Sequence, residues 1–482
     1  MGKAAAILLV LTFLAFSFVF TSIPVNAAPR MIVVPDDYSK IESAVANANN
    51  GDTIFVRKGT YEGSLNQTLI INKAITVHGE DESKTIINLS PPLVQKNIFT
   101  FYYMDYLATI QINSDNVKIT GLTINTPGGA ISATGNKIQI VGITATTGIS
   151  IDGSGTTISE NTLKGDLSVT GNNNTIANNL FKTGVTPLDF HFVGSNNVII
   201  NNMLTSVNET SNIKLDIEGA NNVIANNILR AIYLKGDNNI VYKNSMKVLP
   251  GDCGVYLSHS SGNTICANKI SYAGSLTYEQ EGVFISESHD NFVYANHIES
   301  VFKGAYLQNT DTEPTITNNN IFYHNNFVNN QIQAWDTTSS TTNAFDNGEE
   351  GNYWSCYNGT DANNDGIGDT PYIPTSLYTY DGLVEKITEC SPDNYPLMAP
   401  FDIDSVSVEL PEWANISPSP SPSPSPSPTP FYEPTPTPEA QQTKSLPTVL
   451  VAAASTAIVI VVGSGLLVYF KKRHPKTGDR SS

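Results

Sequence analysis

The sequence predicts an all-β protein whose main part is a parallel β-helix, a solenoid in which short strands stack as rungs. Three observations support this fold class: a repeated Asn-rich phrase, short apolar runs within it, and Asn or Gly where the chain must turn. Aligned on their second residue, the copies begin at 174, 197, 222, 239, 263, 291 and 320, for example NNTIANNL from Asn173 and NNVIANNI from Asn221. Such a period is typical of a solenoid, because a strand too short to bury its own face shares a core with its neighbours.

One Asn of every copy falls five residues after the aligned start, and we expect these side chains to form a ladder inside the solenoid. Equivalent residues of successive rungs lie above each other, so inward amides at one bend can hydrogen-bond along the stack. The regular spacing indicates scaffold rather than a binding site. The expected members are Asn179, Asn202, Asn227, Asn244, Asn268, Asn296 and Asn325.

Residues 28–52 are expected to cap the open N-terminal end of the solenoid. Ser39 followed by Glu42 has the pattern of a capping box. The apolar residues of the short helix that this predicts fall on one face, which would plug the first rung. They are Ile41, Ala44, Val45 and Ala48.

Residues 53–345 are assigned to the repeats, with Thr53–Val56 as the first strand and weaker rungs over residues 69–165. An interruption rich in aromatic residues and proline at 91–108 breaks the period and predicts a loop or lateral flap. We favour a hydrophobic patch on the flank over a substrate lid for this segment.

Export and anchoring are predicted from the two ends of the chain. Residues 1–27 have the charged start, apolar run and small-residue cleavage site of a signal peptide. Residues 401–445 form a Ser/Pro-rich linker with extended polyproline geometry, 446–470 an apolar transmembrane helix, and 471–482 a basic cytoplasmic tail. We therefore expect a single-pass protein on the extracellular face of the membrane. Sequons that glycosylation could use lie at Asn66, Asn88, Asn173, Asn208, Asn358 and Asn415.

Three segments carry a family resemblance: VPDDYSKIESAVANANNGDTIFVRKGTYEG near the start, the NNxIxxNN phrases, and GNYWSCYNGTDANNDGIGDTPYI followed by DNYPLM. Over about residues 31–400 the chain resembles the NosD-type branch of the pectin-lyase-like proteins, with carbohydrate-binding and sugar-hydrolysis repeats. The resemblance implies a right-handed parallel β-helix. It also implies a copper-delivery alternative, since NosD-type proteins are associated with maturation of nitrous-oxide reductase. Soft copper sites want clustered Met, Cys or His, and here Met203, Met246 and Met398 are isolated.

The predicted C-terminal cap, residues 346–400, contains a calcium-like loop at DANNDGIGD. Oxygen ligands at alternate positions with a Gly at the sharp turn match the first nine positions of a calcium loop. The twelfth position is Tyr372 rather than Glu, so the alternative is a loop of Asx turns that ties the end of the solenoid. The candidate Ca²⁺ ligands, with a structural role, are Asp361, Asn363, Asp365, the Ile367 carbonyl and Asp369.

All four cysteines lie in the part expected to be exported, where disulfides can form. We expect Cys356 to pair with Cys390, because they bracket one irregular segment. A bond between Cys253 and Cys266 is left open.

A row of aromatic residues provides the candidate ligand-binding site: Tyr233, Tyr256, Phe284 and Tyr306, from AIYLKG, GVYLSHS, GVFISES and GAYLQN. Their apolar neighbours should face the core, so strand alternation points the rings outward on consecutive rungs. Such a strip could stack on sugar rings. The alternative is that the rings only stabilise the sheet surface.

Catalysis has weaker support. Candidate acids near the strip are Asp216, Glu218, Asp237, Asp252, Glu281, Glu287 and Asp290, while His259 and His289 are interpreted as solvated turn residues. The motifs of polygalacturonases, pectate lyases and alginate epimerases do not occur in the sequence.

The net charge of −18 argues against a nucleic-acid partner. We therefore expect a surface protein that binds a polysaccharide or an envelope glycoprotein without turnover. A polysaccharide lyase, glycosidase or epimerase and a copper-delivery protein are the alternatives.

Overall fold

The computed structural model describes residues 28–63, 67–98, 101–183, 188–206, 213–272, 274, 280–309, 317–338, 342–374, 377–380, 383–386 and 390–414. The chain divides into a unit of residues 1–415 and a unit of residues 416–482, and all described residues belong to the first. The predicted signal peptide, most of the linker, the membrane helix and the tail lie outside the described residues. Among the residues described, no helix is long and apolar enough to cross a membrane.

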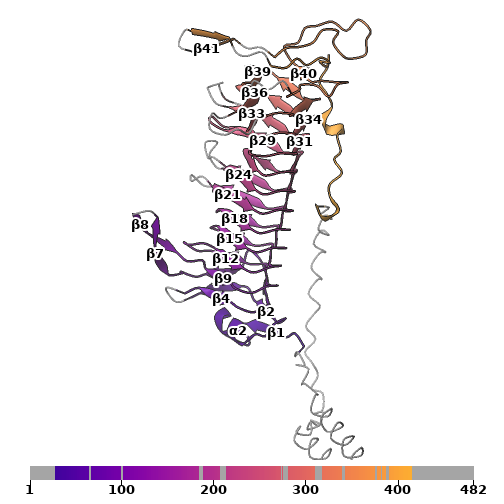
Figure 1. The fold of residues 1–482 in the computed structure, drawn as a ribbon. Coiled ribbons are helices and arrows are strands. Elements are labelled where there is room, and N and C mark those ends of the chain that lie inside the picture. The colour runs from indigo at the N-terminus through magenta and orange to yellow at the C-terminus, as the bar shows by residue number, and fades with distance from the viewer. Residues whose placement is uncertain are drawn as a thin grey trace, which may run out of the picture. The chain divides into compact units, whose positions relative to one another are not determined.

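The described chain is a solenoid of three long parallel sheets, with each full rung adding one strand to every sheet (Figure 1). The first sheet, sheet A, holds β1 (Met31–Val34), β2 (Thr53–Val56), β5 (Thr76–Gly79), β10 (Lys118–Thr120), β13 (Gln139–Val141), β16 (Thr157–Ser159), β19 (Thr175–Ala177), β22 (Val198–Ile200), β25 (Val223–Ala225), β28 (Ile240–Tyr242), β31 (Thr264–Cys266), β34 (Phe292–Tyr294) and β37 (Ile321–Tyr323).

Sheet B follows sheet A along each rung. It holds β3 (Gly59–Glu62), β6 (Thr85–Asn88), β11 (Thr123–Ile124), β14 (Thr144–Ala145), β17 (Thr162–Leu163), β20 (Leu180–Thr183), β23 (Met203–Ser206), β26 (Ile228–Leu229), β29 (Ser245–Lys247), β32 (Lys269–Ser271), β35 (His297–Glu299), β38 (Asn326–Val328) and β40 (Tyr353–Trp354).

Sheet C completes the rung and carries the longest strands. It holds β4 (Leu69–Ile71), β9 (Ile110–Ile112), β12 (Ile131–Thr134), β15 (Ile149–Asp152), β18 (Leu167–Thr170), β21 (Leu188–Val193), β24 (Ile213–Glu218), β27 (Ala231–Lys235), β30 (Cys253–Ser258), β33 (Glu281–Ser286), β36 (Lys303–Gln308) and β39 (Ile332–Asp336). The predicted parallel β-helix is confirmed.

The core consists of columns of like residues held in register. In sheet A, for example, Ile158 pairs with Ile176, Ile176 with Ile199 and Ile199 with Ile224, and all four are buried. Burying each such side chain contributes about 1.5–3 kcal/mol. A strand of three residues is therefore stable only because the rungs above and below cover it.

The Asn ladder is confirmed, and it explains why the phrase contains Asn doublets. The first Asn of a doublet, such as Asn226, takes a left-handed backbone conformation with φ of 54°, which Asn tolerates better than most residues. The second, Asn227, is buried and donates through Nδ2 to Asn244 Oδ1 at 3.0 Å and to the Ile199 carbonyl at 2.8 Å. The ladder runs further than predicted, from Asn161 to Asn352.

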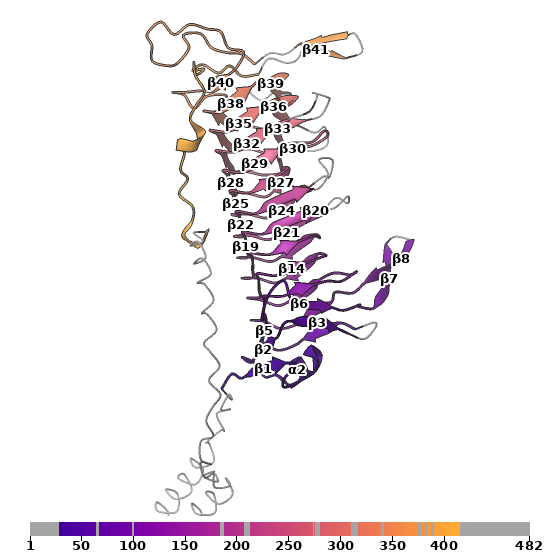
Figure 2. The same cartoon turned by 180° about the vertical axis from the view of Figure 1, so that it is seen from behind.

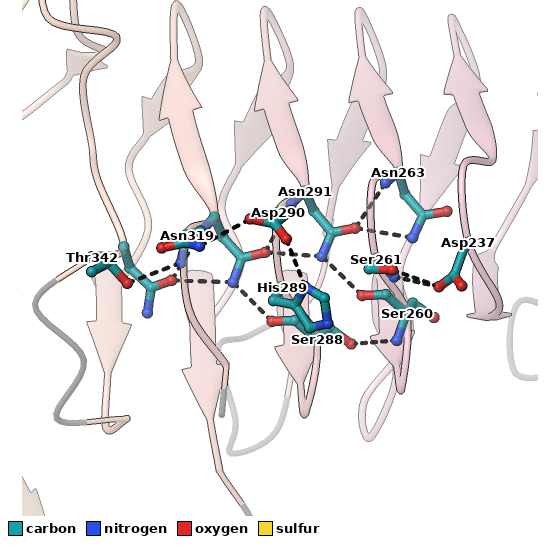
Figure 3. Close-up of polar contacts among 12 residues, drawn as sticks. Asp237, Ser260, Ser261, Asn263, Ser288, His289, Asp290, Asn291, Asn319 and Thr342 are labelled. Atoms are coloured by element: carbon teal, nitrogen blue, oxygen red, sulfur yellow. Dashed lines mark hydrogen bonds and ion pairs between the residues drawn. The ribbon is translucent and has the colours of Figure 1, made fainter. Parts of the chain in front are cut away.

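A second Asn ladder, which the sequence interpretation missed, follows sheet C at the turn into sheet A. Asn263 donates to Asn291 Oδ1 at 2.9 Å, and Asn291 donates to Asn320 Oδ1 at 2.9 Å (Figure 3). Its members are the aligned start residues themselves, Asn174, Asn197, Asn222, Asn239, Asn263, Asn291 and Asn320, followed by Asn343. Two corners of the rung are thus fixed by amide stacks.

The N-terminal end is closed by β1 and by α2 (Ile41–Asn47), which buries Ile41, Ala44 and Val45 as predicted. The prediction of a capping box is wrong, because Lys40 is the N-cap of the helix and no side chain caps it. The first strand is also earlier than predicted, since β1 pairs in parallel with β2. Buried Asp52 ties this end together by accepting from the Arg30 guanidinium at 2.8 Å. That partner lowers the pKa of Asp52 to about 2.

The interruption at 91–108 is an antiparallel hairpin of β7 (Leu93–Ile98) and β8 (Phe101–Tyr106), which projects from the side of the solenoid as a flap (Figure 1). A second hairpin, β41 (Leu377–Tyr380) with β42 (Leu383–Lys386), belongs to the C-terminal end.

The C-terminal end is closed around Asp393, which is fully buried. Its Oδ2 accepts from the Asn352 backbone N–H and from Trp354 Nε1, both at 2.7 Å. The Trp354 ring in turn stacks on Phe327 at 4.5 Å. Burial raises the pKa of Asp393 to about 6, against the lowering effect of these donors.

Residues 399–414 then run back along the flank of the solenoid as a strap, which contains η1 (Ile403–Ser405) and η2 (Glu412–Ala414) (Figure 2). The strap is bonded to three rungs. The Phe401 backbone bonds to the Asn326 side-chain amide, and Lys269 donates to the Asp404 carboxylate. The Tyr242 hydroxyl donates to the Val406 carbonyl.

Candidate ligand-binding face on sheet C

The predicted aromatic row is a continuous column on the outer face of sheet C. Tyr233, Tyr256, Phe284 and Tyr306 pair with one another in register on β27, β30, β33 and β36. Their rings follow each other at centroid distances of 5.4, 4.7 and 4.7 Å, and each side chain is half-buried. The outward orientation is confirmed, because the residues on either side of each ring belong to the buried core.

Trp335 on β39 extends the column by a fifth ring, which sequence reasoning missed. It pairs with Tyr306, and the two ring centroids are 5.4 Å apart. Trp335 lies in IQAWD, which lacks the Gly-x-aromatic pattern of the three preceding rungs. The alternation of buried Ile332 and Ala334 with half-exposed Trp335 was the available signal.

A polar row lies beside the rings, formed by Cys253, Glu281 and Lys303, which are neighbours in register. Lys303 Nζ is 2.9 Å from Glu281 Oε1, and the Cys253 thiol donates to Glu281 Oε2 at 3.4 Å. The same ammonium lies 4.0 Å from the Tyr306 ring centroid and 5.0 Å from that of Trp335. This nearly buried ion pair therefore holds the upper rings of the column in place through cation–π contacts.

Three glycines allow the polar row and the rings to share one face. They follow the polar residues directly, at Gly254, Gly282 and Gly304. A Cβ at Gly254 would lie 2.5 Å from Ile270 Cγ2, and one at Gly282 would lie 2.4 Å from Ile298 Cγ2, both in the core. Because two successive positions face inward here, strict alternation fails and strand periodicity could not place the polar row.

At the Tyr233 end, the column opens into a groove of about 250 Å³ on β21, β24, β27 and β30, which is lined by the Tyr233 and Tyr256 rings and by polar side chains. The Tyr233 hydroxyl donates to Asp252 Oδ1 at 3.3 Å, and Lys214 Nζ lies 4.7 Å from the Tyr233 ring centroid. Burial, with the nearby Cys253 and Asp252, raises the pKa of Tyr233. The polar lining consists of His191, Asp216, Glu218, Lys235 and Ser258.

The other candidate acids are dispersed. Asp252 and Glu281 are buried beside the rings, whereas Asp237 and Asp290 lie in the turns that follow sheet C. Figure 3 shows Asp237 accepting from Ser261, and Asp290 bonded to His289 and Asn319. His289 is a half-exposed turn residue, as predicted, and His259 is also half-exposed in a turn, but its Nε2 contacts the buried Glu287 carboxylate.

The predicted calcium loop is tied by its own backbone. Asp361 accepts from the N–H groups of Asp365 and Gly366, Asp365 accepts from that of Ile367, and Asp369 accepts from that of Ala362. Asn363 Nδ2 also donates to Asp365 Oδ2 at 2.8 Å. These Asx turns fit the alternative interpretation, and calcium binding stays a prediction. In the described part of the chain, no three His, Cys, Asp or Glu side chains converge as a metal ion would require.

The expected Cys356–Cys390 disulfide is wrong for this structure, in which all four cysteines are free thiols. Each sulfur has another partner: Cys356 Sγ lies 3.0 Å from the Tyr372 hydroxyl, and the buried Cys390 thiol donates to the Ala334 carbonyl at 3.5 Å. Burial raises the pKa of the Cys390 thiol to about 12.

Comparison with known proteins places a family match on this part of the chain. Residues 190–359, which include the whole aromatic column, match the family described as periplasmic copper-binding protein (NosD). A probable ABC transporter binding protein NosD of Stutzerimonas stutzeri is 33% identical over 130 residues, which are 25% of this chain and 28% of that protein. The match thus spans little more than a quarter of the relative's length.

Solved structures similar to this chain include three that act on or bind polysaccharides by their titles. A mannuronic-acid-specific family 6 polysaccharide lyase from human gut microbiota has a TM-score of 0.42 and 13% identity, and the match covers 65% of this chain and 83% of that one. A GH87 α-1,3-glucanase catalytic domain in complex with tetrasaccharides has a TM-score of 0.45 and 12% identity, and the match covers 66% of each chain. A mannuronan C-5 epimerase A-module of Azotobacter vinelandii has a TM-score of 0.37 and 13% identity, and the match covers 65% of this chain and 88% of that one. Identities this low carry no information on activity. The observed architecture makes this chain a parallel β-helix protein, and its residues 190–359 are similar to the NosD family.

Proposed function

We propose that the outer face of sheet C binds a glycan without cleaving the sugar chain, and that the protein displays this face outside the cell. The single observation that carries the proposal is the column of five rings in register, from Tyr233 to Trp335. Aromatic faces stack on the apolar faces of sugar rings, and polar groups beside them fix orientation.

The surroundings of the column support binding rather than mere surface packing. Rings that only stabilised the sheet would need no groove, yet the column leads into one with acidic, basic and hydroxyl side chains. Two of the rings are also held in position, because Lys303 is paired with Glu281 and contacts the faces of Tyr306 and Trp335. A pre-positioned platform loses little side-chain entropy when a ligand binds.

The location of the protein is the second part of the proposal. The predicted signal peptide at 1–27 and the apolar run at 446–470 support export and a single C-terminal anchor, and an envelope glycoprotein would supply the glycan. Protease treatment of intact cells should remove the ectodomain. Protection of the ectodomain would contradict this orientation.

Retention on a glycan array tests the binding. Replacing Tyr233, Tyr256 and Tyr306 with Ser should abolish retention, whereas Phe292→Ser, which removes an exposed ring from sheet A, should not. Unchanged retention of the triple variant, with its melting temperature preserved, would refute the proposal. New reducing ends or unsaturated products from bound polysaccharides would instead favour the lyase, glycosidase or epimerase alternative.

A further inference from the structure

The turn that follows sheet C contains a departure from the repeat at two adjacent rungs. Glycine occupies the first position after the strand at Gly194, Gly219 and Gly236, with φ between 141° and 143°. A Cβ at Gly219 or Gly236 would lie only 2.0 or 2.1 Å from the carbonyl oxygen of the glycine one rung before. On the next two rungs this position holds His259 and Glu287, both left-handed with φ of 50°.

Left-handed backbone costs a residue with a side chain about 1 kcal/mol or more, and this solenoid also accepts it at other turns, for example at Lys243, Ala267 and Ala295. A further cost is electrostatic, because the Glu287 carboxylate is 4% exposed. Its Oε1 atom is buried and has no hydrogen-bond partner among the residues described. The backbone conformation is therefore ordinary for this fold, and the feature that packing does not explain is the buried Glu287 carboxylate.

The contacts link the two residues to a hydroxyl on the groove. His259 Nε2 lies 2.7 Å from Glu287 Oε2, and His259 Nδ1 lies 3.0 Å from Ser258 Oγ. When Nε2 carries the proton and donates it to Glu287, the Nδ1 lone pair faces the Ser258 hydroxyl. The arrangement has a nucleophile, a base and a carboxylate that orients the base, each within hydrogen-bond reach of the next.

Ser258 is also accessible to a ligand. It is the last residue of β30 and lines the groove beside Tyr256. Lys235 lines the same groove and ends the adjacent strand, since Leu234 pairs with Leu257. Its ammonium supplies a positive charge on the groove for the negative charge that develops at a carbonyl oxygen attacked by Ser258.

We propose that Ser258, His259 and Glu287 hydrolyse acyl esters, an activity that would leave a bound sugar chain intact. Ser258 Oγ attacks the ester carbonyl carbon as its proton passes to His259 Nδ1. The bond to the alcohol breaks, and His259 returns the proton to the departing alkoxide. Water then attacks the acyl carbon and gives a proton to His259. The bond from this carbon to Ser258 Oγ breaks, His259 returns the proton to Ser258 Oγ, and the carboxylic acid leaves. Ser258 and His259 are the catalytic residues, and Glu287 is a positioning residue.

Hydrolysis of p-nitrophenyl acetate by the full-length protein tests the proposal. Ser258→Ala and His259→Ala should each lower kcat by about 100-fold or more, whereas His289→Ala, the matched turn histidine, should leave it unchanged. A fluorophosphonate should label the wild-type protein, with the adduct located on Ser258 by mass spectrometry. Full turnover by Ser258→Ala, or a folded wild type with neither turnover nor label, would overturn the assignment.

The role of Glu287 needs a separate readout. Glu287→Gln should lower kcat with KM unchanged, and Glu287→Asp should restore part of the loss, while a KM effect alone would contradict positioning. Failure of this activity is distinguishable from failure of glycan binding. His259→Ala, which does not line the groove, should still be retained on the array, and Tyr306→Ser, whose ring lies outside the groove, should still hydrolyse p-nitrophenyl acetate.

Discussion

Replacing Asn268 with Ala tests whether the amide ladder holds the rungs together. Asn268 Oδ1 accepts from the backbone N–H of Asn244 at 2.9 Å and from its Nδ2 at 3.0 Å. Its own Nδ2 donates to the Val241 carbonyl and to Asn296 Oδ1, both at 2.9 Å. The substitution removes all four bonds. It leaves the buried Asn244 N–H without an acceptor, while Asn296 Oδ1 keeps the Asn268 backbone donor at 3.0 Å.

Each polar group left without a partner in a dry interior costs about 1–3 kcal/mol. With the Asn244 N–H orphaned and the Val241 carbonyl losing a donor, we expect unfolding to become easier by about 2–6 kcal/mol. Asn226→Gly is the matched control, because Asn226 is exposed and left-handed and glycine accepts that backbone without strain. Its effect should stay within about 0.5 kcal/mol.

Urea unfolding followed by circular dichroism gives the global effect, and hydrogen exchange at the Asn244 amide gives the local one. Repeat arrays can unfold in parts, so the midpoint and the slope of each transition should both be compared. If Asn268→Ala shifts the midpoint no more than Asn226→Gly and Asn244 remains protected, the ladder does not stabilise the solenoid.

Three further outcomes are expected. Lys303→Met should destabilise the protein by about 3–5 kcal/mol, because it leaves the buried Glu281 carboxylate without its cation. Adding Glu281→Gln should recover much of that loss in a double-mutant cycle, and additive losses would contradict the coupling. Burial raises the pKa of Asp393 from 3.8 to about 6, so its contribution to stability, about 3 kcal/mol in all, is fully present below pH 4 and is lost as the pH rises through 6. Asp393→Asn should therefore flatten the dependence of the thermal midpoint on pH over this range. An unchanged profile would refute the assignment. Calcium should raise the melting temperature of the wild type but not of Asp361→Asn/Asp365→Asn; no shift in the wild type would rule out the predicted site.

Much of the scaffold follows from the sequence because its physical signals repeat. The spacing of Asn227 and its equivalents predicted one ladder and the parallel stack, and the alternation around Tyr256 predicted the outward column. The second ladder was missed although Asn222 and its equivalents carry the same spacing, because the doublets were interpreted only through their later Asn.

The parts of the candidate site that sequence did not predict depend on local departures from regular structure. The inward glycines at 254, 282 and 304 break strand alternation, so Glu281 and Lys303 could not be assigned to the face that carries the rings. The link between His259 and Glu287 joins neighbouring rungs across 28 residues of chain and depends on two left-handed residues. Neither sequence spacing nor composition reports such a backbone conformation.

Most of the variation in rung length lies at one corner of the three-sheet rung, the connection from sheet B to sheet C. Both ladders border the strands of sheet A, whereas the length of the connection from sheet B to sheet C varies. Between β26 and β27 it is residue 230 alone, and between β32 and β33 it is residues 272–280. Rungs of different length therefore share the same amide stacks and the same core columns. Insertions at this one corner alter the border of the ring-bearing face at little energetic cost, because loop closure grows only slowly with length. New recognition can thus evolve beside sheet C by exchange of connecting segments, with the stacking machinery left untouched.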